Sequence, residues 1–266
     1  MQILLPPSEG KATPPDGGPV DLDTLSFPKL TGDRVDLMSS LVLLCRDDPA
    51  KAAEVLGLGP TQAAEVDRNA ALPHAPAAPA RSVYTGVLYN ALGLSTLDGP
   101  AATRADSSIA IMSSVFGAIR PPDRIPAYRL GGAVRLPGIG PVATFWRSVL
   151  RDVLTAAVGD ELVVDLRSTT YAGFWRPPAT VAPRVVTIRV LHEANGRRTV
   201  VSHHNKATKG RLVRTMLTEA DVDAAHTPET LATFMRDHGW TVELASPERH
   251  GKPWNLDVIV THVLTT

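Results

Sequence analysis

The distribution of apolar and polar positions along the chain predicts an α/β protein with a mixed sheet. Short apolar runs, each bounded by proline, glycine or charged residues, are typical of buried strands. Helical spacing of apolar side chains marks residues 32–71, 144–158 and 212–217. The predicted strands cover residues 2–5, 108–112, 162–166, 185–191, 199–202, 241–244 and 257–263, with a hairpin turn at Asn195 and Gly196. We expect a single compact domain, residues 1–266, with residues 32–71 as a helical insertion.

The helical insertion contains a glycine-bearing turn. Asp48 and Pro49 mark the start of a short helix, and Gly57 and Gly59 separate that helix from a second one. This arrangement resembles a helix–hairpin–helix motif, whose turn offers backbone N–H groups to a nucleic-acid phosphate. Ordinary helix packing is the favoured alternative, because two short helices joined by a glycine turn are common and the second helix carries Glu65 and Asp67 and few cations.

The most basic stretch of the chain is residues 200–216, VVSHHNKATKGRLVRTM, which has six basic or imidazole side chains and no acid. Val200 and Val201 are expected to end a strand, and Asn205 and Gly210 to form turns. The side chains placed at this strand-to-helix junction are His203, His204, Lys206, Lys209 and Arg211. Free N–H groups at a helix start, beside cations, favour phosphate. A solvated basic helix entry is the alternative.

Three further segments place ionisable or hydrogen-bonding groups at predicted strand ends or in stiff loops. Open α/β sheets bind ligands at the carboxyl ends of their strands. The groups are Glu9 and Lys11 in PPSEGK; Asp165, Arg167, Ser168 and Tyr171 after residues 162–166; and Arg120, Asp123, Tyr128 and Arg129 in a proline-rich loop. The alternatives are an ordinary polar turn for the first segment and a buried structural Asp165–Arg167 pair for the second.

Composition narrows the choice of partner and compartment. Lysine plus arginine equals aspartate plus glutamate at 27 each, so attraction for nucleic acid has to come from a local patch. Cys45 is the only cysteine, which excludes an intrachain disulfide and is compatible with a reducing compartment. The start, MQILLPP, lacks the features of a signal peptide, and no apolar run reaches the roughly 20 residues of a membrane span. We expect a cytoplasmic monomer without a membrane partner.

Five blocks together resemble the YaaA family of peroxide-stress proteins: LLPPSEGK, YTGVLY, FGAIRPPDRIPAYRL, DLRSTTYAGFW and HHNKATKGR. They span nearly the whole chain, and LGLGP falls where that family has its helix–hairpin–helix element. The last block departs from the family's Lys-Lys and Ala-Arg-Gly strings, and the first has Ser8 and Glu9 where others have Pro-Ala. The resemblance implies one mixed α/β body with a positively charged cleft, DNA binding, and a role in limiting oxidative damage and free iron.

Two functions fit these residues. In the first, a basic cleft binds single-stranded or distorted DNA, with phosphates on cations and a base stacked on Tyr128 or Tyr171. The phosphate-binding set is Lys11, Arg120, Arg129, Arg167, Ser168, Asn205, Lys206, Lys209, Arg211, Gly57 and Gly59.

In the second function, an enzyme acts on a nucleoside, nucleotide or damaged base. Its candidate acids or bases are Glu9, Asp123 and Asp165, and its candidate amines or phosphate clamps are Lys11, Lys206 and Lys209. No GxSxG, HExxH or Cys–His signature is present. We expect no cofactor and no metal, because His203 and His204 are neighbours whose side chains would point to opposite faces of an extended segment.

Overall fold

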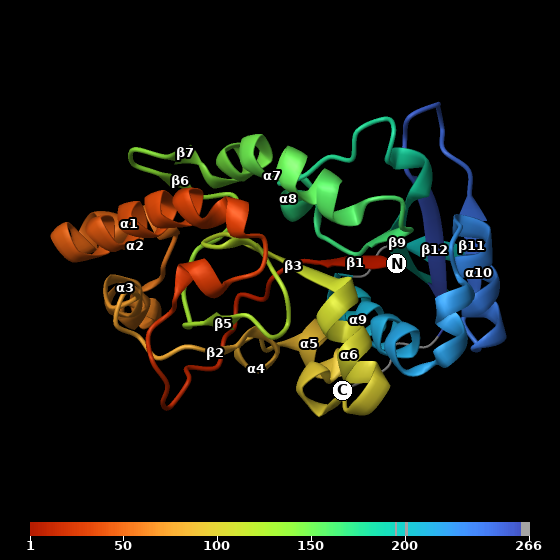
Figure 1. Ribbon diagram of the computed structural model, residues 1–266, viewed down its shortest axis with the longest axis horizontal. Helices are drawn as coiled ribbons and strands as arrows, with labels where there is room; N and C mark the ends of the chain where they lie inside the picture. Colours follow the sequence, from red (N-terminus) through yellow and green to blue (C-terminus); the bar gives the residue numbers. More distant parts are fainter. Residues whose placement is uncertain (195, 200–201, 262–266) are drawn as a thin grey trace.

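The computed structural model of the protein describes residues 1–194, 196–199 and 202–261, and confirms a mixed α/β fold built on an eight-stranded sheet (Figure 1). In spatial order the strands are β11 (Val242–Ala245), β12 (Trp254–Val260), β9 (Val185–Ala194), β8 (Val163–Asp165), β1 (Gln2–Leu5), β3 (Ile109–Ser113) and β4 (Gly117–Ile119), with β10 (Arg197–Thr199) paired to β9. The last strand starts three residues earlier than its sequence predicts. Residues 262–263 of that prediction lie outside the described part.

β1 lies in the interior of the sheet, between β8 and β3. β1 pairs in parallel with β3 on one side and β8 on the other, and β8, β9 and β12 continue the parallel part. The outer strands β4, β10 and β11 are antiparallel. Ile3, Leu4 and Leu5 have no exposed surface, as expected for a parallel strand covered on both faces.

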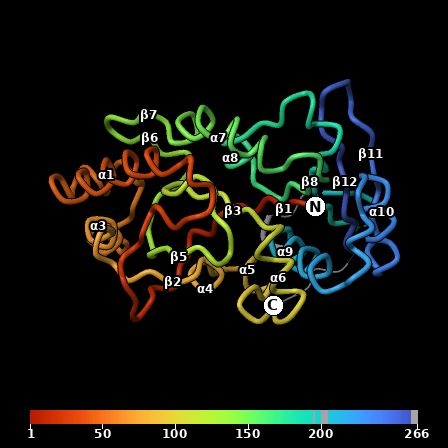
Figure 2. The backbone as a smooth tube through the Cα atoms, viewed as in Figure 1, coloured from red at the N-terminus to blue at the C-terminus, as the bar shows by residue number. Residues whose placement is uncertain are grey.

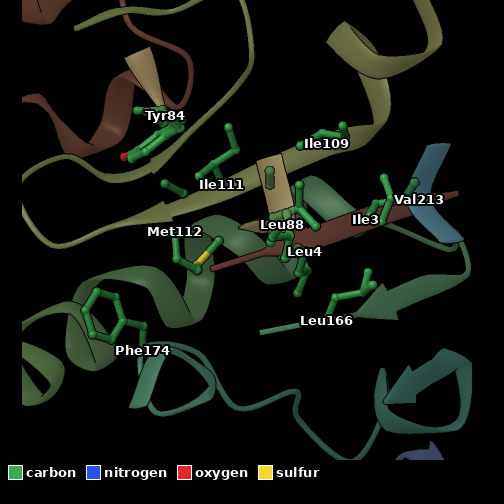
Figure 3. Close-up of a cluster of buried hydrophobic side chains, with 14 of the residues drawn as sticks. Ile3, Leu4, Tyr84, Leu88, Ile109, Ile111, Met112, Leu166, Phe174 and Val213 are labelled. Atoms are coloured by element: carbon green, nitrogen blue, oxygen red, sulfur yellow. The ribbon is translucent and has the colours of Figure 1, made fainter. Parts of the chain in front are cut away.

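Helices cover both faces of the sheet (Figure 1). On one face lie α7 (Val142–Val158) and α8 (Thr169–Ala172), and on the other lie α5 (Val87–Leu92), α6 (Gly99–Ser108) and α9 (Ser202–Thr218). α10 (Pro228–Asp237) stands beside β11, and Thr227 caps its start by accepting a hydrogen bond from the backbone N–H of Thr230. Ile3, Leu88 and Val213 lie in one buried cluster that joins the sheet to α5 and α9 (Figure 3). No helix in the described ranges is long and apolar enough to cross a bilayer.

The predicted helical segment, residues 32–71, forms α1 (Thr31–Asp47), α2 (Pro49–Leu56) and α3 (Ala64–Ala70). Asp48 caps α2 by accepting from the Lys51 N–H at 3.0 Å, and Gly57 ends it in the left-handed conformation with φ of 65°. The turn predicted between two short helices is therefore present. The long loop before α1 runs beside the short strand β2 (Ala78–Pro79), where the Ala77 N–H donates to the Gly18 carbonyl (Figure 2).

The prediction of turns within the basic stretch is wrong. α9 is helical from Ser202 onward, so Asn205 and Gly210 lie inside a helix. A Cβ at Gly210 would lie 2.3 Å from the Leu88 carbonyl oxygen, which shows that this glycine lets α9 pack against the backbone of α5. Val200, Val201 and Asn195, which were expected to end a strand and to form a hairpin turn, lie outside the described residues.

We expect Gly210→Ala to lower the free energy of unfolding by about 1–3 kcal/mol, because the added methyl meets backbone atoms that cannot swing away. Gly32→Ala is the matched control. Gly32 lies in α1 with no atom within 4 Å of an added Cβ, so we expect a change of about 0.5 kcal/mol or less in the stabilising direction. Urea denaturation of both variants measures the contrast, and equal effects would contradict the close-packing role of Gly210.

Candidate functional site: a cationic cavity at the ends of β1 and β8

The strand order creates a crevice between two adjacent parallel strands. The chain leaves β1 towards β3 but leaves β8 towards β9, so the loops that follow these neighbours diverge. Such a switch point is where open α/β sheets hold their ligands. A cavity of about 730 Å³ opens there. Its lining comes from residues 6–11, 56–57, 85–89, 129–133, 168, 170, 171 and 206.

The cavity brings together predicted residues from segments that are far apart in sequence. They are Glu9, Lys11, Gly57, Arg129, Ser168, Tyr171 and Lys206. Lysine and arginine outnumber acids in this set. Its one carboxylate, on Glu9, is largely exposed and pairs with Arg129 at 3.2 Å. The lining is therefore cationic, and its groups suit an anion such as phosphate.

Lys11 is the most constrained cation of the cavity. The prolines that end β1 turn the chain so that its Nζ donates to the Ser8 carbonyl at 2.8 Å. The same atom lies 4.0 Å from the ring centroid of Tyr128 and 5.5 Å from that of Tyr84. Burial, followed by the nearby charge of Arg129, lowers the pKa of Lys11 to about 7. A substantial fraction of the amine is therefore neutral at physiological pH.

A tyrosine cluster forms the floor beneath this amine. The Tyr84 and Tyr128 hydroxyls share a hydrogen bond of 2.9 Å, and Tyr128 also bonds to the Ser113 hydroxyl at 2.8 Å. Tyr89 stacks on Tyr84 and donates to the Pro6 carbonyl. Burial raises the pKa of all three phenols. Tyr128 is buried, so its predicted role of stacking on a base is corrected to one of supporting Lys11.

Tyr171 reaches the cavity wall, and its contacts point to a residue that the sequence did not single out. Its hydroxyl shares a hydrogen bond of 3.1 Å with Ser114 and accepts from the Gly132 N–H at 3.2 Å. A Cβ at Gly132 would lie 3.0 Å from ring atoms of Tyr171 and Phe174. The glycine pair directly after the Y-R-L string was the available signal. Thr85 and Thr170 also line the cavity without having been predicted.

Asp165 and Arg167 form a buried ion pair, which was predicted as the alternative to a direct role in ligand binding. Two guanidinium nitrogens of Arg167 donate to the carboxylate oxygens at 2.8 and 2.6 Å. Burial alone would raise the pKa of Asp165, but the charge and hydrogen bonds of Arg167, with the more distant Lys209, hold it below its usual range. Lys209 donates to the Leu166 carbonyl at 3.1 Å, and burial lowers its pKa. These three charged groups do not line the cavity. Arg167 and Lys209 instead donate to the backbone carbonyls of Tyr171 and Leu166, next to the lining.

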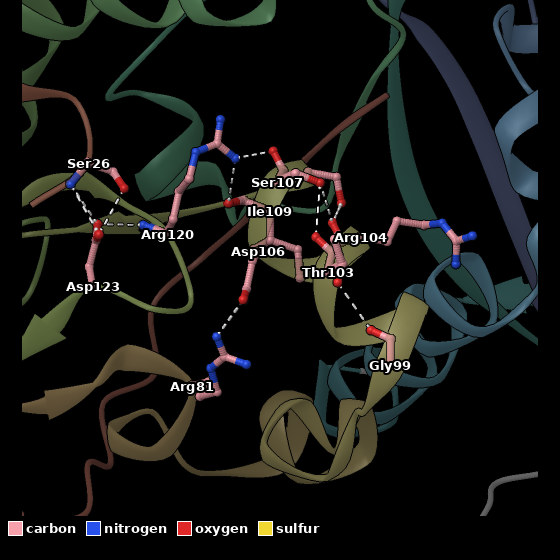
Figure 4. Close-up of polar contacts among 11 residues, drawn as sticks. Ser26, Arg81, Gly99, Thr103, Arg104, Asp106, Ser107, Ile109, Arg120 and Asp123 are labelled. Carbon is pink, nitrogen blue, oxygen red and sulfur yellow. Dashed lines mark hydrogen bonds and ion pairs between the residues drawn. The ribbon is translucent and has the colours of Figure 1, made fainter.

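Arg120 and Asp123, which were predicted to join the same site, do not line the cavity. Both Asp123 oxygens accept hydrogen bonds from Ser26, and one also accepts from the Arg120 backbone N–H at 2.8 Å (Figure 4). The Arg120 guanidinium donates to the Ser107 carbonyl and to the Gln2 side chain, at the amino end of β1. This is the opposite edge of the sheet from the cavity. Both side chains hold loops in place.

The remaining candidates are not among the residues that line the cavity. Asn205 and Arg211 are partly buried on α9, and Gly59 caps the short turn before α3. His203 and His204 fall in the first turn of α9. The argument that adjacent side chains of an extended segment point to opposite faces therefore does not apply to them. Across the described residues, no group of three or more histidine, cysteine, aspartate or glutamate side chains is placed to hold a metal ion.

Comparison with known proteins agrees with this arrangement of blocks. The family profile described as peroxide stress protein YaaA matches residues 1–245. The chain belongs to this family. A UPF0246 protein of Streptomyces coelicolor is 48% identical over 263 residues, covering 99% of this chain and 100% of that protein. UPF0246 proteins of Corynebacterium efficiens and Corynebacterium glutamicum are 41% and 38% identical over 248 residues, covering 92% and 91% of this chain and 95% of each relative.

Proposed function

We propose that this YaaA-family protein binds DNA in the peroxide-stress response, limiting oxidative damage, and that its cavity holds one nucleotide with its phosphates. The observation that carries the proposal is the convergence of Lys11, Arg129 and Lys206 on one cavity at the switch point between β1 and β8. Arginine and lysine are the side chains that proteins use most to contact phosphate. Ser168 adds a hydroxyl at the same wall, which can donate to a phosphate oxygen.

The size of the cavity supports a single unpaired nucleotide as the occupant. At about 730 Å³ it falls in the range of small-ligand sites and is far too small for a duplex. Tyr171 presents an aromatic ring at its wall, and stacking on such a ring contributes about 1–3 kcal/mol per base. Single-stranded or distorted DNA is therefore the favoured partner. Leu56 and Gly57 place the turn after α2 at the cavity rim, where the helix–hairpin–helix-like element would meet the backbone of the bound strand.

We expect Arg129→Ala combined with Lys206→Ala to weaken binding to single-stranded DNA and to flatten its salt dependence. Loss of two phosphate contacts should reduce the slope of log affinity against log salt by about 1.4, because each contact on a single strand contributes about 0.7. Fluorescence anisotropy with a labelled oligonucleotide across a salt series measures this slope.

Arg236→Ala is the matched control, since Arg236 is an exposed arginine on α10, outside the cavity. It should leave the slope unchanged. If the double variant keeps the wild-type slope, the cavity is not the phosphate contact.

An enzyme acting on a nucleoside, nucleotide or damaged base is the second candidate, and one observation favours it. Simple phosphate binding is served best by a fully charged lysine, whereas the pKa of Lys11 is lowered to about 7 by burial and by Arg129. A partly neutral amine in a desolvated pocket is the state that nucleophilic lysines require.

A further inference from the structure

We propose that the Lys11 amine is a nucleophile that forms an imine with the aldehyde of a phosphate-bearing sugar, the favoured source being an abasic deoxyribose in DNA. This inference rests on the proposed function, because the cations assigned to phosphate binding also position the sugar. It adds a reaction at a named atom, which DNA binding alone does not require.

The contacts of Lys11 leave the amine available for attack. Nζ donates to two backbone carbonyls, of Ser8 at 2.8 Å and of Glu9 at 3.4 Å, and lies against the faces of Tyr128 and Tyr84. Within the described part of the chain, no carboxylate forms an ion pair with it. An amine that pairs with a carboxylate would stay protonated and unreactive. Here two carbonyls and two aromatic faces hold Nζ and favour the ammonium, and burial together with Arg129 outweighs that preference and lowers the pKa of Lys11.

Charged groups around the amine act in both directions. Arg129 and Arg68 lower the pKa of Lys11, whereas Glu65 and Glu9 raise it, and burial, the largest contribution, lowers it. Glu65 is itself paired with Arg68 at 2.5 Å, and Glu9 with Arg129 at 3.2 Å. The acids are therefore offset by their own arginines, and with a pKa of about 7 a substantial fraction of the amine is neutral near physiological pH.

The neighbours of Lys11 define the substrate class. Arg129 and Lys206 line the same cavity and offer fixed positive charge to phosphate groups, while Ser168 offers a hydroxyl. Apolar side chains such as Leu56, Val87 and Leu130 also line the cavity, so the preference for a phosphate-bearing aldehyde comes from the cations. An aldehyde with one or two phosphates satisfies both the amine and the cations. Loss of a base from DNA leaves such a sugar, since its open-chain form has an aldehyde at C1′ and phosphates on either side.

Imine formation releases one molecule of water and needs no other reactant. The Nζ lone pair attacks C1′, the carbonyl π electrons move to oxygen, and a proton lost from nitrogen is taken up by that oxygen. The resulting carbinolamine forms the C=N bond by expelling its hydroxyl group with a proton as water. The Glu9 carboxyl also lines the cavity and is the nearest acid along the chain that can carry this proton. Water reverses the reaction and releases the aldehyde.

Borohydride trapping tests the proposal with two probes. One is an oligonucleotide with a single abasic site, and the other is 2-deoxyribose 5-phosphate. Reduction converts the imine to a stable secondary amine, which denaturing electrophoresis and peptide mass spectrometry locate. The proteins are wild type, Lys11→Arg, Lys11→Gln and, as a control, Lys29→Arg, whose lysine is exposed and lies outside the cavity lining. Each is first checked for a cooperative unfolding transition. Binding of the unmodified oligonucleotide is measured in parallel.

We expect an adduct on the peptide containing Lys11, at least 50-fold less of it in both Lys11 variants, and no more than a threefold change in Lys29→Arg. The capture rate of wild type should level off above pH 8, because the amine is then already neutral. Capture by an ordinary lysine would keep rising about tenfold per pH unit towards pH 10.

The outcomes separate the inference from the proposed function. An adduct with the oligonucleotide alone identifies DNA as the source, and one with the free sugar phosphate alone identifies a small metabolite. No adduct with either probe, or an adduct that persists in Lys11→Gln, overturns the inference. In that case intact binding of the unmodified oligonucleotide with its salt dependence would leave the proposed DNA-binding function standing.

Discussion

Replacing Arg167 by methionine is expected to lower the free energy of unfolding by about 3–5 kcal/mol, because Asp165 would be left charged and unpaired in the interior. The Arg167 side chain is 1% exposed and that of Asp165 9% exposed. The carboxylate would keep the Arg167 backbone N–H and the distant charge of Lys209 as its remaining partners. Urea denaturation at pH 7 measures the loss.

The chain supplies a matched control in Arg198→Met. Arg198 makes a two-pronged contact with Glu243 at 2.7 and 3.0 Å, but its side chain is 40% exposed and that of Glu243 is 56% exposed. Solvent screening should make that loss much smaller than the loss at the buried pair. The double variant Asp165→Asn with Arg167→Met should recover part of the stability. Equal losses at the buried and exposed pairs would contradict this account of the pair.

Lys11→Met is expected to change the free energy of unfolding in a pH-dependent way. At pH 6 the substitution should be about 3–5 kcal/mol more stabilising than at pH 10, at about 1.4 kcal/mol per unit of pKa difference between the folded and unfolded chain. The pKa of Lys11 is about 7 in the folded protein, against a reference value of 10.5. Between these values the unfolded chain binds more protons than the folded one, so the stability of wild type rises with pH. The methionine variant lacks this rise.

Unfolding free energies of both proteins from pH 6 to pH 10 measure the difference, and groups other than Lys11 contribute equally to the two. Lys11→Arg is the informative companion, since arginine stays charged throughout. It should be less stable than Lys11→Met by a constant amount over this range. A difference between wild type and Lys11→Met that does not change with pH would show that the amine stays charged.

Local pattern was enough to predict much of the fold. The apolar run of residues 2–5 is stopped by two prolines, and the amphipathic spacing of residues 144–158 ends at Gly159, so both elements could be placed without tertiary information. The helical position of Gly210 could not be predicted in this way, because a glycine is needed there to let α9 approach the backbone of Leu88 on another helix. A glycine in a polar stretch has the same sequence signature whether it forms a turn or a close helix contact.

The site was predictable where a candidate follows directly from a strand. Lys11 and Ser168 come after β1 and β8, and strand direction alone places both at the carboxyl edge of the sheet. Arg120 and Arg129 occupy one proline-rich loop and are chemically alike, yet they reach opposite edges. Only the pairing of β3 with β4 decides which arginine reaches the cavity. That pairing depends on strand order, which periodicity does not encode.

The interior position of β1 has a consequence for synthesis. This strand is made before its two neighbours, because Ile3 pairs with Ile109 on one side and with Val164 on the other. At roughly 5–20 residues per second, its second neighbour leaves the ribosome about 10–30 seconds later. Until then the nascent chain carries an apolar strand with an unpaired edge, which is the kind of segment that chaperones protect. The chain is therefore at risk of aggregation during synthesis, through a strand that is fully buried once folding is complete.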